Sequence, residues 1–142
     1  MVVPPSKSEP NATWSAPTIF SGLRSRCRCC GKGNCLHNAN TQFELNQCAG
    51  ADASAADAEL NRVYQRLLSS LKGDEVAVGK LRAAQRAWVA FRDAQLEALF
   101  PAENKQTEYG SMYPMCYAGA ATVMTKERTA QLRQMLEGEG PC

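Results

Sequence analysis

Five cysteines lie close together in the segment RSRCRCCGKGNCLHNANTQFELNQC, and their thiols are the groups of this sequence best suited to chemistry. Thiolates in ligand pairs of matching spacing bind zinc, whereas cysteines in an oxidising compartment form disulfides. Zinc is disfavoured because Cys27, Cys29, Cys30 and Cys35 are crowded and the only histidine is His37. A disulfide framework, or two unrelated groups of cysteines that adjoin, are the alternatives left open.

The chain has seven cysteines, so at least one thiol is free or paired between chains. The pairing of Cys116 and Cys142 does not follow from the sequence. His37 stands alone, so no Ser-His or Cys-His nucleophile pair is visible. Carboxylates that lie close together, such as Asp57 and Glu59, suit a solvated helix face better than acid–base catalysis. We therefore expect no enzyme, no metal site and no cofactor.

Length and charge point to one domain with a basic head. A chain of 142 residues that is 44% hydrophobic can bury one core, and no run of about 18 uncharged apolar residues could span a bilayer. Residues 1–35 carry five Lys or Arg and one Asp or Glu, whereas residues 36–142 carry eleven and thirteen. The body has neither the basic face nor the docking motif of a nucleic-acid-binding protein, so no nucleic-acid partner is expected.

The first part of the chain is expected to be disordered. Residues 1–26 are rich in proline and serine, show no periodicity, and lack the apolar stretch of roughly 7–15 residues that a secretory signal needs. The expected organisation is a disordered cysteine-rich basic head over 1–34, a helical domain over 35–138, and a tail over 139–142.

Helices are expected from Thr41 onward, because prolines become rare and apolar residues recur at helical spacing. A short helix is predicted over residues 41–48, with Thr41 as N-cap and Glu44 completing a capping box. Ser54 is predicted to cap the next helix. The long helices are predicted over residues 54–72, 74–100 and 114–138. The fold class is therefore all-α, a small antiparallel bundle of three long helices plus a short N-terminal helix.

Each of the first two long segments has an apolar face at helical spacing. The face of the first consists of Ala56, Leu60, Val63, Leu67 and Leu71. The face of the second is predicted to consist of Leu81, Ala84, Trp88, Phe91, Gln95 and Leu99, with Gln85 and Arg92 beside it.

Three short patterns in the helical body resemble the LprI-type N-terminal domain family of bacterial envelope proteins. The patterns are ADAELNRVYQRLL, AQRAWVAFRDAQ, and GSMYP followed by TKERTAQL, and the likeness spans residues 35–136. The residues that carry it are Asp57, Leu60, Asn61, Tyr64, Gln85, Trp88, Phe91, Arg92, Asp93, Gly110, Ser111, Thr125, Arg128 and Leu132.

The resemblance implies a disulfide and an exported protein. The family's leading cysteine–threonine–cysteine pattern is similar to Cys35, Thr41 and Cys48, which makes Cys35–Cys48 the implied disulfide, in the periplasm or outside the cell. Because no signal is visible, we interpret residues 1–34 as an altered or misassigned start, with a cytoplasmic variant as the alternative.

The motif residues Asp57, Asn61, Tyr64, Gln85, Trp88, Arg92 and Arg128 have two interpretations. The first is a structural polar network, in which Asp57 neutralises Arg92 or Arg128, Asn61 and Gln85 supply the remaining hydrogen bonds, and Trp88 supplies buried area. Such a network is expected because buried charges must be paired. The second is a site for a ligand or partner.

The resemblance implies binding of lysozyme as the most concrete activity. The segment FPAENKQTEYGSMYP is the expected contact element, although it also suits an ordinary interhelical connection. The alternatives are a structural or interaction module that binds another envelope protein, and an intracellular metal- or nucleic-acid-binding protein that uses the head. The candidate contact residues are Glu103, Glu108, Tyr109, Ser111, Met112 and Tyr113.

Overall fold

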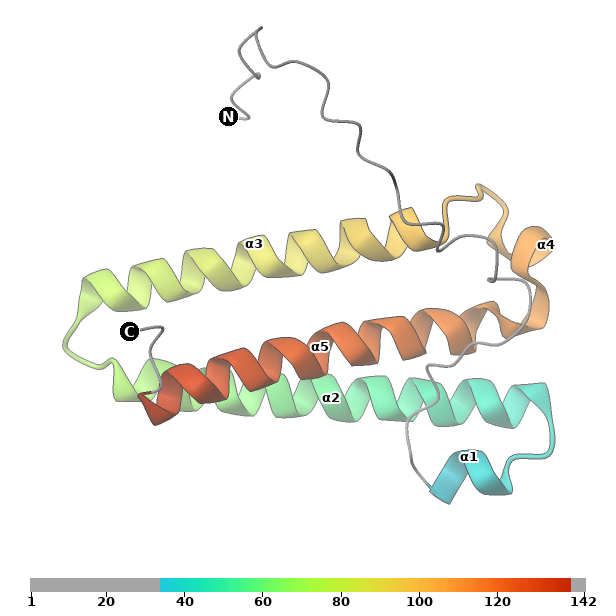
Figure 1. Cartoon of the computed structure of the whole chain (residues 1–142), viewed down its shortest axis with the longest axis horizontal. Coiled ribbons are helices and arrows are strands. Elements are labelled where there is room, and N and C mark those ends of the chain that lie inside the picture. The colour runs from blue at the N-terminus through green and yellow to red at the C-terminus, as the bar shows by residue number, and fades with distance from the viewer. Residues whose placement is uncertain (1–33, 139–142) are drawn as a thin grey trace, which may run out of the picture.

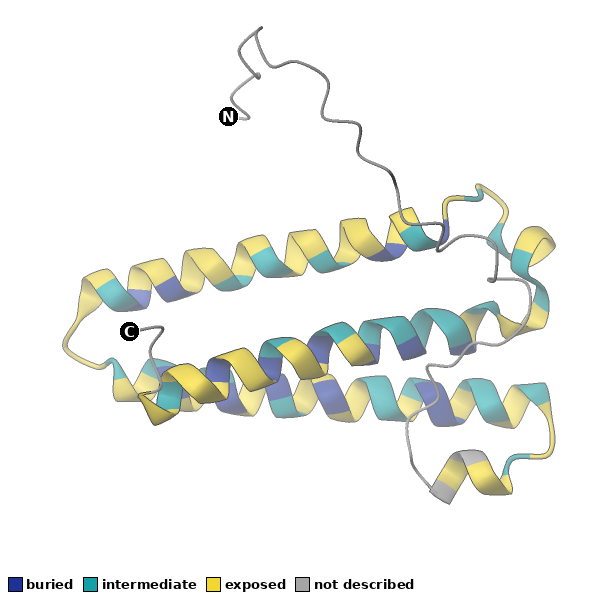
Figure 2. Cartoon of the chain, in the orientation of Figure 1, coloured by how far each residue is buried: buried dark blue, intermediate teal, exposed yellow. Residues whose placement is uncertain are grey.

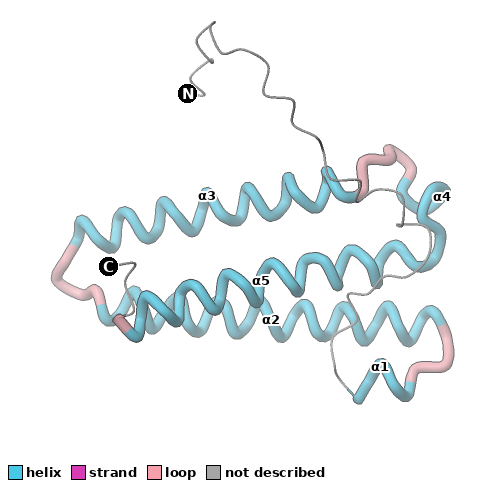
Figure 3. The backbone as a smooth tube through the Cα atoms, in the orientation of Figure 1, coloured by secondary structure: helices cyan, strands magenta, loops and turns pink. Residues whose placement is uncertain are grey.

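Three long helices and three short helical turns form the part of the chain that the structure describes. The structure is a computed structural model that describes residues 34–138, apart from the side chains of Asn34 and Leu36. In chain order the elements are α1 (Asn34–Asn38), α2 (Gln42–Ser70), α3 (Glu75–Leu99), α4 (Lys105–Tyr109), the 3-10 turn η2 (Gly110–Met112) and α5 (Tyr113–Glu137). Within these residues there is no strand, and Figures 1 and 3 show the long helices running side by side. The all-α fold class predicted from the sequence is confirmed.

The centre of the bundle is the pair α2 and α5, which pack along most of their length. The buried face of α5 has a large residue near each end, Met115 and Leu132, and smaller residues between them: Gly119, Thr122, Thr125 and Thr129. The Thr122 hydroxyl donates to the Ala118 carbonyl at 2.7 Å, and the Thr129 hydroxyl donates to the Thr125 carbonyl at 2.8 Å. Because these hydroxyls are satisfied within α5, their burial carries no unmet hydrogen-bonding cost, and the small side chains allow α2 to approach closely.

The predicted apolar stripe of α2 is the face that is buried against α5. Ala56, Leu60, Val63 and Leu67 are each no more than 5% exposed, and Leu71 lies at the edge. Leu60, Val63, Leu67, Leu81 and Leu132 form one core cluster, in which α2, α3 and α5 meet (Figure 2).

The boundary predicted within α2 is wrong. Residues 41–48 do not form a separate helix, and Ser54 is not a cap, because α2 is continuous from Gln42 to Ser70. The Ser54 hydroxyl donates instead to the Gly50 carbonyl at 3.0 Å, inside the helix. Gly50 lies inside the helix, where a glycine costs about 1 kcal/mol relative to alanine. The alanines around it and the burial of Cys48 and Ala49 offset this cost.

The predicted core face of α3 is also partly wrong. Phe91 is 58% exposed, and Ala84 and Gln95 are exposed as well. The inward face of α3 is rotated by about one residue and includes the polar residues that were expected beside it. It consists of Val78, Leu81, Gln85, Trp88, Arg92, Leu96 and Leu99, which are buried or half-buried. The positions of the apolar residues alone mispredict this face, because long polar side chains fill the space between α3 and the α2–α5 pair.

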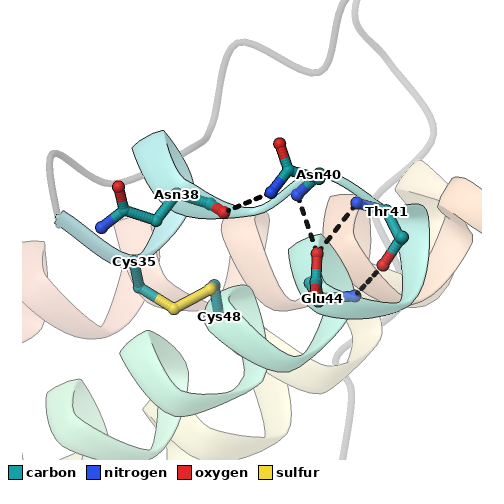
Figure 4. Close-up of a disulfide and its surroundings, with 6 residues drawn as sticks. All are labelled: Cys35, Asn38, Asn40, Thr41, Glu44 and Cys48. Carbon is teal, nitrogen blue, oxygen red and sulfur yellow. Dashed lines mark hydrogen bonds between the residues drawn. A yellow bond between two sulfur atoms is a disulfide. The ribbon is translucent and has the colours of Figure 1, made fainter.

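The start of α2 is held by two features that the sequence predicted. Thr41 is the N-cap, and the capping box with Glu44 is complete, since the Thr41 side chain accepts from the Glu44 amide at 3.2 Å. The disulfide Cys35–Cys48, with its Cα atoms 5.8 Å apart, ties α1 to α2 (Figure 4). Cys116, whose pairing the sequence left open, is also disulfide-bonded.

The capping carboxylate makes the stability of the α2 start dependent on pH. Glu44 Oε2 accepts from the Asn40 amide at 2.7 Å and from the Thr41 amide at 3.0 Å, and these hydrogen bonds lower the pKa of Glu44 from its ordinary value of 4.5. A lowered pKa stabilises the fold above the ordinary value, and that contribution disappears as the pH falls through the lowered one.

Replacing Glu44 with glutamine is therefore expected to flatten the acid side of the stability profile. The amide still caps the helix but no longer titrates, so the melting temperature should fall less steeply below about pH 4.5 than in the wild type. Circular dichroism melts between pH 3 and 6, with Glu127→Gln as control, measure this. Parallel acid profiles for wild type and Glu44→Gln would contradict the role of Glu44.

The predictions for the head and the tail lie mostly outside the described residues. The disordered head over 1–34, including Cys27, Cys29 and Cys30, and the tail over 139–142 therefore remain predictions. Among the described helices, none combines the length and the apolar character that crossing a bilayer requires.

Candidate functional site

The end of the bundle at which α3 ends and α5 begins is organised by a cluster of four aromatic rings. Phe100, only 7% exposed, lies at its centre, with ring centroids 5.5 Å from Tyr109, 5.3 Å from Tyr113 and 6.1 Å from Tyr117. Tyr109 and Tyr113 stack at 5.9 Å. Edge-to-face and offset pairs of this kind stabilise beyond the area they bury, so the cluster holds the connection after Phe100 in one shape.

One polar contact within this connection and two to the long helices hold it in place. The Tyr109 hydroxyl accepts from the Ala102 amide at 3.3 Å, and the Asn46 side chain of α2 donates to the Ser111 carbonyl at 3.0 Å. Lys105 Nζ donates to Glu97 Oε2 of α3 at 2.6 Å, which raises the pKa of Lys105. Asn104 caps α4 by accepting from the Thr107 amide at 3.0 Å. The predicted contact segment is therefore an ordered surface that contains a helix.

The candidate contact residues divide into two groups in the structure. Glu103, Glu108, Ser111 and Met112 are exposed, and Met112 is 42% exposed although it is apolar. Tyr109 and Tyr113 are half-buried in the aromatic cluster, and burial raises the pKa of the Tyr113 phenol. The tyrosines thus shape the surface, while the two glutamates and Met112 are presented on it.

The charge of the described residues is separated along the bundle. The α4 end, defined here as the α4 connection with the adjoining start of α2 and end of α3, presents four exposed carboxylates and one cation. The carboxylates are Glu44, Glu97, Glu103 and Glu108, and the cation is Lys105. The opposite half carries more cations than carboxylates: its cations are Arg62, Arg66, Lys72, Lys80, Arg82, Arg86, Lys126, Arg128 and Arg133, and its carboxylates include Glu59, Asp74, Glu75, Glu127 and Glu137. The α4 end therefore has a local excess of negative charge.

The motif residues form a polar layer between α3 and the α2–α5 pair. Arg92 Nη1 of α3 lies 3.3 Å from Asp57 Oδ1 of α2, and the Thr125 hydroxyl of α5 donates to the same carboxylate oxygen at 3.4 Å. Arg128 Nε donates to Gln85 Oε1 at 3.1 Å, and burial lowers the pKa of Arg128. Of the two pairings considered for Asp57, the structure shows the one with Arg92.

Three other motif residues lie around this layer. Trp88 is half-buried against the core cluster, and its ring lies 5.3 Å from the Arg92 guanidinium carbon, a cation–π contact. Tyr64 is half-buried at the edge of the core. Asn61 is exposed and forms no side-chain hydrogen bond with another described residue, contrary to its expected part in the network.

Several grooves on the described surface lie away from the α4 connection. One of about 570 Å³ lies between α2 and α3, lined by Tyr64, Gln65, Leu68, Arg82, Gln85, Arg86 and Val89. Neither histidine nor a pair of carboxylates lies in it, so its lining contains no acid–base pair. Among the described residues no three His, Cys, Asp or Glu side chains are grouped to bind a metal ion.

Comparison with known proteins places the chain in a family. The sequence model of the family described as lysozyme inhibitor LprI matches residues 34–132, which are nearly all of the described bundle. The chain belongs to the LprI lysozyme inhibitor family. The resemblance noted from the three motifs is thereby confirmed.

One curated relative is similar to most of this chain. It is an uncharacterized protein of Rhizobium meliloti (strain 1021), 37% identical over 111 residues that cover 70% of this chain and 76% of the relative. No solved structure matches the chain.

Sequence reasoning missed several residues at the α4 end of this LprI-family domain. Phe100 was treated only as the residue before Pro101, and Tyr117, Glu97 and Asn46 were not singled out. One signal was available, because Tyr109, Tyr113 and Tyr117 recur every four residues across the predicted helix start. The contact of Asn46 with Ser111 joins residues 65 positions apart, which no local pattern indicates.

Proposed function

We propose that the chain is an exported envelope protein that inhibits lysozyme by binding it through the α4 end. Membership of a family described as lysozyme inhibitors supports the activity. The observation that supports this particular surface is the set of exposed carboxylates, of which Glu103 and Glu108 form no ion pair with another described residue.

Electrostatic complementarity supports the choice of partner. Lysozymes are usually basic, and a basic partner approaching the bundle is attracted to its acidic half and repelled by its cationic half. Met112, which follows Glu103 and Glu108 in the chain and directly precedes α5, is exposed and offers an apolar contact. An ordered surface loses little conformational entropy on binding, and the aromatic cluster and the three polar contacts order this one.

No catalytic step is part of this proposal. Inhibition would follow from occupying the lysozyme surface, so the chain acts as a binding protein. The alternative is a structural or interaction module of the envelope that binds a different component, and the experiment below separates the two.

A lytic assay tests the proposal directly. The oxidised full chain is titrated against basic lysozymes acting on bacterial cell walls, and saturable inhibition is expected. The variant Glu103→Lys with Glu108→Lys should weaken inhibition about tenfold, because two attractive charges become repulsive at the contact. The matched control is Glu127→Lys with Glu137→Lys, which makes the same change in net charge on exposed residues of α5.

Two results would contradict parts of the proposal. Folded protein that inhibits no lysozyme tested would favour the interaction module. Inhibition that is equally sensitive to both double variants would show that the net charge matters and that the α4 end does not. Circular dichroism of each variant confirms that the helical fold is kept.

A further inference from the structure

The face of α3 that points away from the core is apolar and has no partner among the described residues. Phe91 and Val76, both large apolar residues of α3, are 58% and 68% exposed. Between and around them lie four exposed alanines: Ala83, Ala87, Ala90 and Ala94. The buried residues of α3, such as Leu81 and Leu96, lie on the opposite side of the helix. The helix is therefore apolar on two faces, and the bundle covers only one.

The spacing along this outer face is that of a helix–helix seam. Positions 80, 83, 87, 90, 94 and 97 alternate steps of three and four residues, the repeat by which two helices pack side by side. The four central positions are alanines, which let two helices approach closely. The two outer positions are charged, with Lys80 at the start and Glu97 at the end.

The order of charges makes this face complementary to itself. If a second α3 lies antiparallel, Ala87 faces Ala90 of the second copy, Ala83 faces Ala94, and Lys80 faces Glu97. Beside the seam, the same arrangement brings Arg86 next to Asp93 of the second copy. Each contact occurs twice, because a two-fold axis relates the copies. A parallel arrangement would instead place Lys80 against Lys80.

The charged groups of this face are available for such contacts. Lys80 and Arg86 form no ion pair with another described residue. Asp93 and Glu97 contact Arg92 and Lys105 in their own chain, yet their side chains remain 57% and 62% exposed. Each carboxylate can thus accept a second cation without losing its first.

We propose that the outer face of α3, residues 76–97, is a docking surface for a second copy of this chain, which binds antiparallel to form a two-fold symmetric dimer. Phe91 lies beside the seam, where it covers Ala84 of the second copy. This arrangement leaves the two α4 ends pointing in opposite directions, and of the four α4-end carboxylates it covers only Glu97. The inference does not depend on the proposed function.

The oligomeric state of the full chain is the first test. Sedimentation velocity over a range of concentrations should show a dimer in equilibrium with a monomer. Ala87→Glu, which places like charges in the middle of the seam, should weaken self-association at least about a hundredfold. Ala130→Glu makes the same substitution at an exposed position of α5 and should leave the dimer intact.

Charge reversal tests the antiparallel register. Lys80→Glu with Arg86→Glu makes the face wholly acidic, and Asp93→Lys with Glu97→Lys makes it wholly basic. Each double variant alone should be monomeric, and an equimolar mixture should form heterodimers, which misfolded variants cannot do. A monomeric wild type at every concentration would overturn the proposal, as would a dimer that Ala87→Glu or either charge variant leaves unchanged. Unaltered lysozyme inhibition by monomeric Ala87→Glu would show that this surface and the α4 end act separately.

Discussion

Replacing Leu132 with alanine is expected to lower the free energy of unfolding by about 3–5 kcal/mol. Leu132 is 0% exposed and lies in the core cluster with Leu60, Val63, Leu67 and Leu81, where the three long helices meet. The buried residue one turn before it on α5 is Thr129, whose hydroxyl donates to the Thr125 carbonyl at 2.8 Å and cannot replace the lost apolar contacts. The substitution removes apolar contacts from all three helices and leaves a cavity, and both effects destabilise the fold.

Chemical denaturation followed by circular dichroism at 222 nm, a helix signal, measures this loss. Met135→Ala is the matched control, since Met135 lies less than one turn further along α5 but is 53% exposed. That control should change the free energy of unfolding by no more than about 0.5 kcal/mol. A loss below about 1 kcal/mol for Leu132→Ala, or equal losses for both variants, would place the core elsewhere.

Removing the disulfide Cys35–Cys48 is expected to destabilise the domain by about 2–4 kcal/mol. The bond joins residues 13 positions apart, and it keeps α1 against the start of α2. Without it the unfolded chain gains freedom, and α1 depends on few other contacts to stay in place. Cys48 is only 5% exposed, so a serine there also places a hydroxyl in an apolar setting.

The double variant Cys35→Ser with Cys48→Ser removes this bond and leaves Cys116 intact, whereas a reductant would also act on Cys116. Thermal unfolding should begin at a lower temperature, while the helical signal at low temperature stays near that of the wild type because α2, α3 and α5 are still present. Lysozyme inhibition at low temperature should persist if the α4 end alone makes the contact. An unchanged melting temperature would mean that the disulfide is not needed for stability.

The elements that local sequence determines were predicted well. The N-cap at Thr41, the end of α3 before Pro101 and the start of α5 at Pro114 all depend on residues within one helical turn. The stripe of α2 from Ala56 to Leu71 was equally clear, because its residues are apolar without exception. Family membership was also visible in motifs that each lie within one segment.

The errors arose where a local preference competes with packing. Gly50 and Ser54 are typical of a break between helices, yet burial of Cys48 and Ala49 keeps α2 continuous. On α3 the apolar residue Phe91 is outside, whereas Arg92 is half-buried, since Asp57 of α2 neutralises it. Propensity and hydrophobicity describe one segment at a time and contain no information about such partners.

The candidate site was found only in part for the same reason. Glu103, Glu108 and Met112 could be named because they lie in one polar connection. The roles of Tyr109 and Tyr113 depend on Phe100 and Tyr117, and the order of the connection depends on Asn46 and Glu97. These contacts join the ends of different helices.

Four features could be predicted from the sequence: the helical fold class, most of the ends of the long helices, the family resemblance, and the disulfide that this resemblance implies. Such features depend on short-range periodicity, capping and motifs. Three features depend on the tertiary structure: which face of α3 is inside, the continuity of α2, and the position of the α4-end carboxylates far from most of the cations. These depend on how distant segments meet, and the free energy of that packing exceeds the small local preferences that a sequence displays.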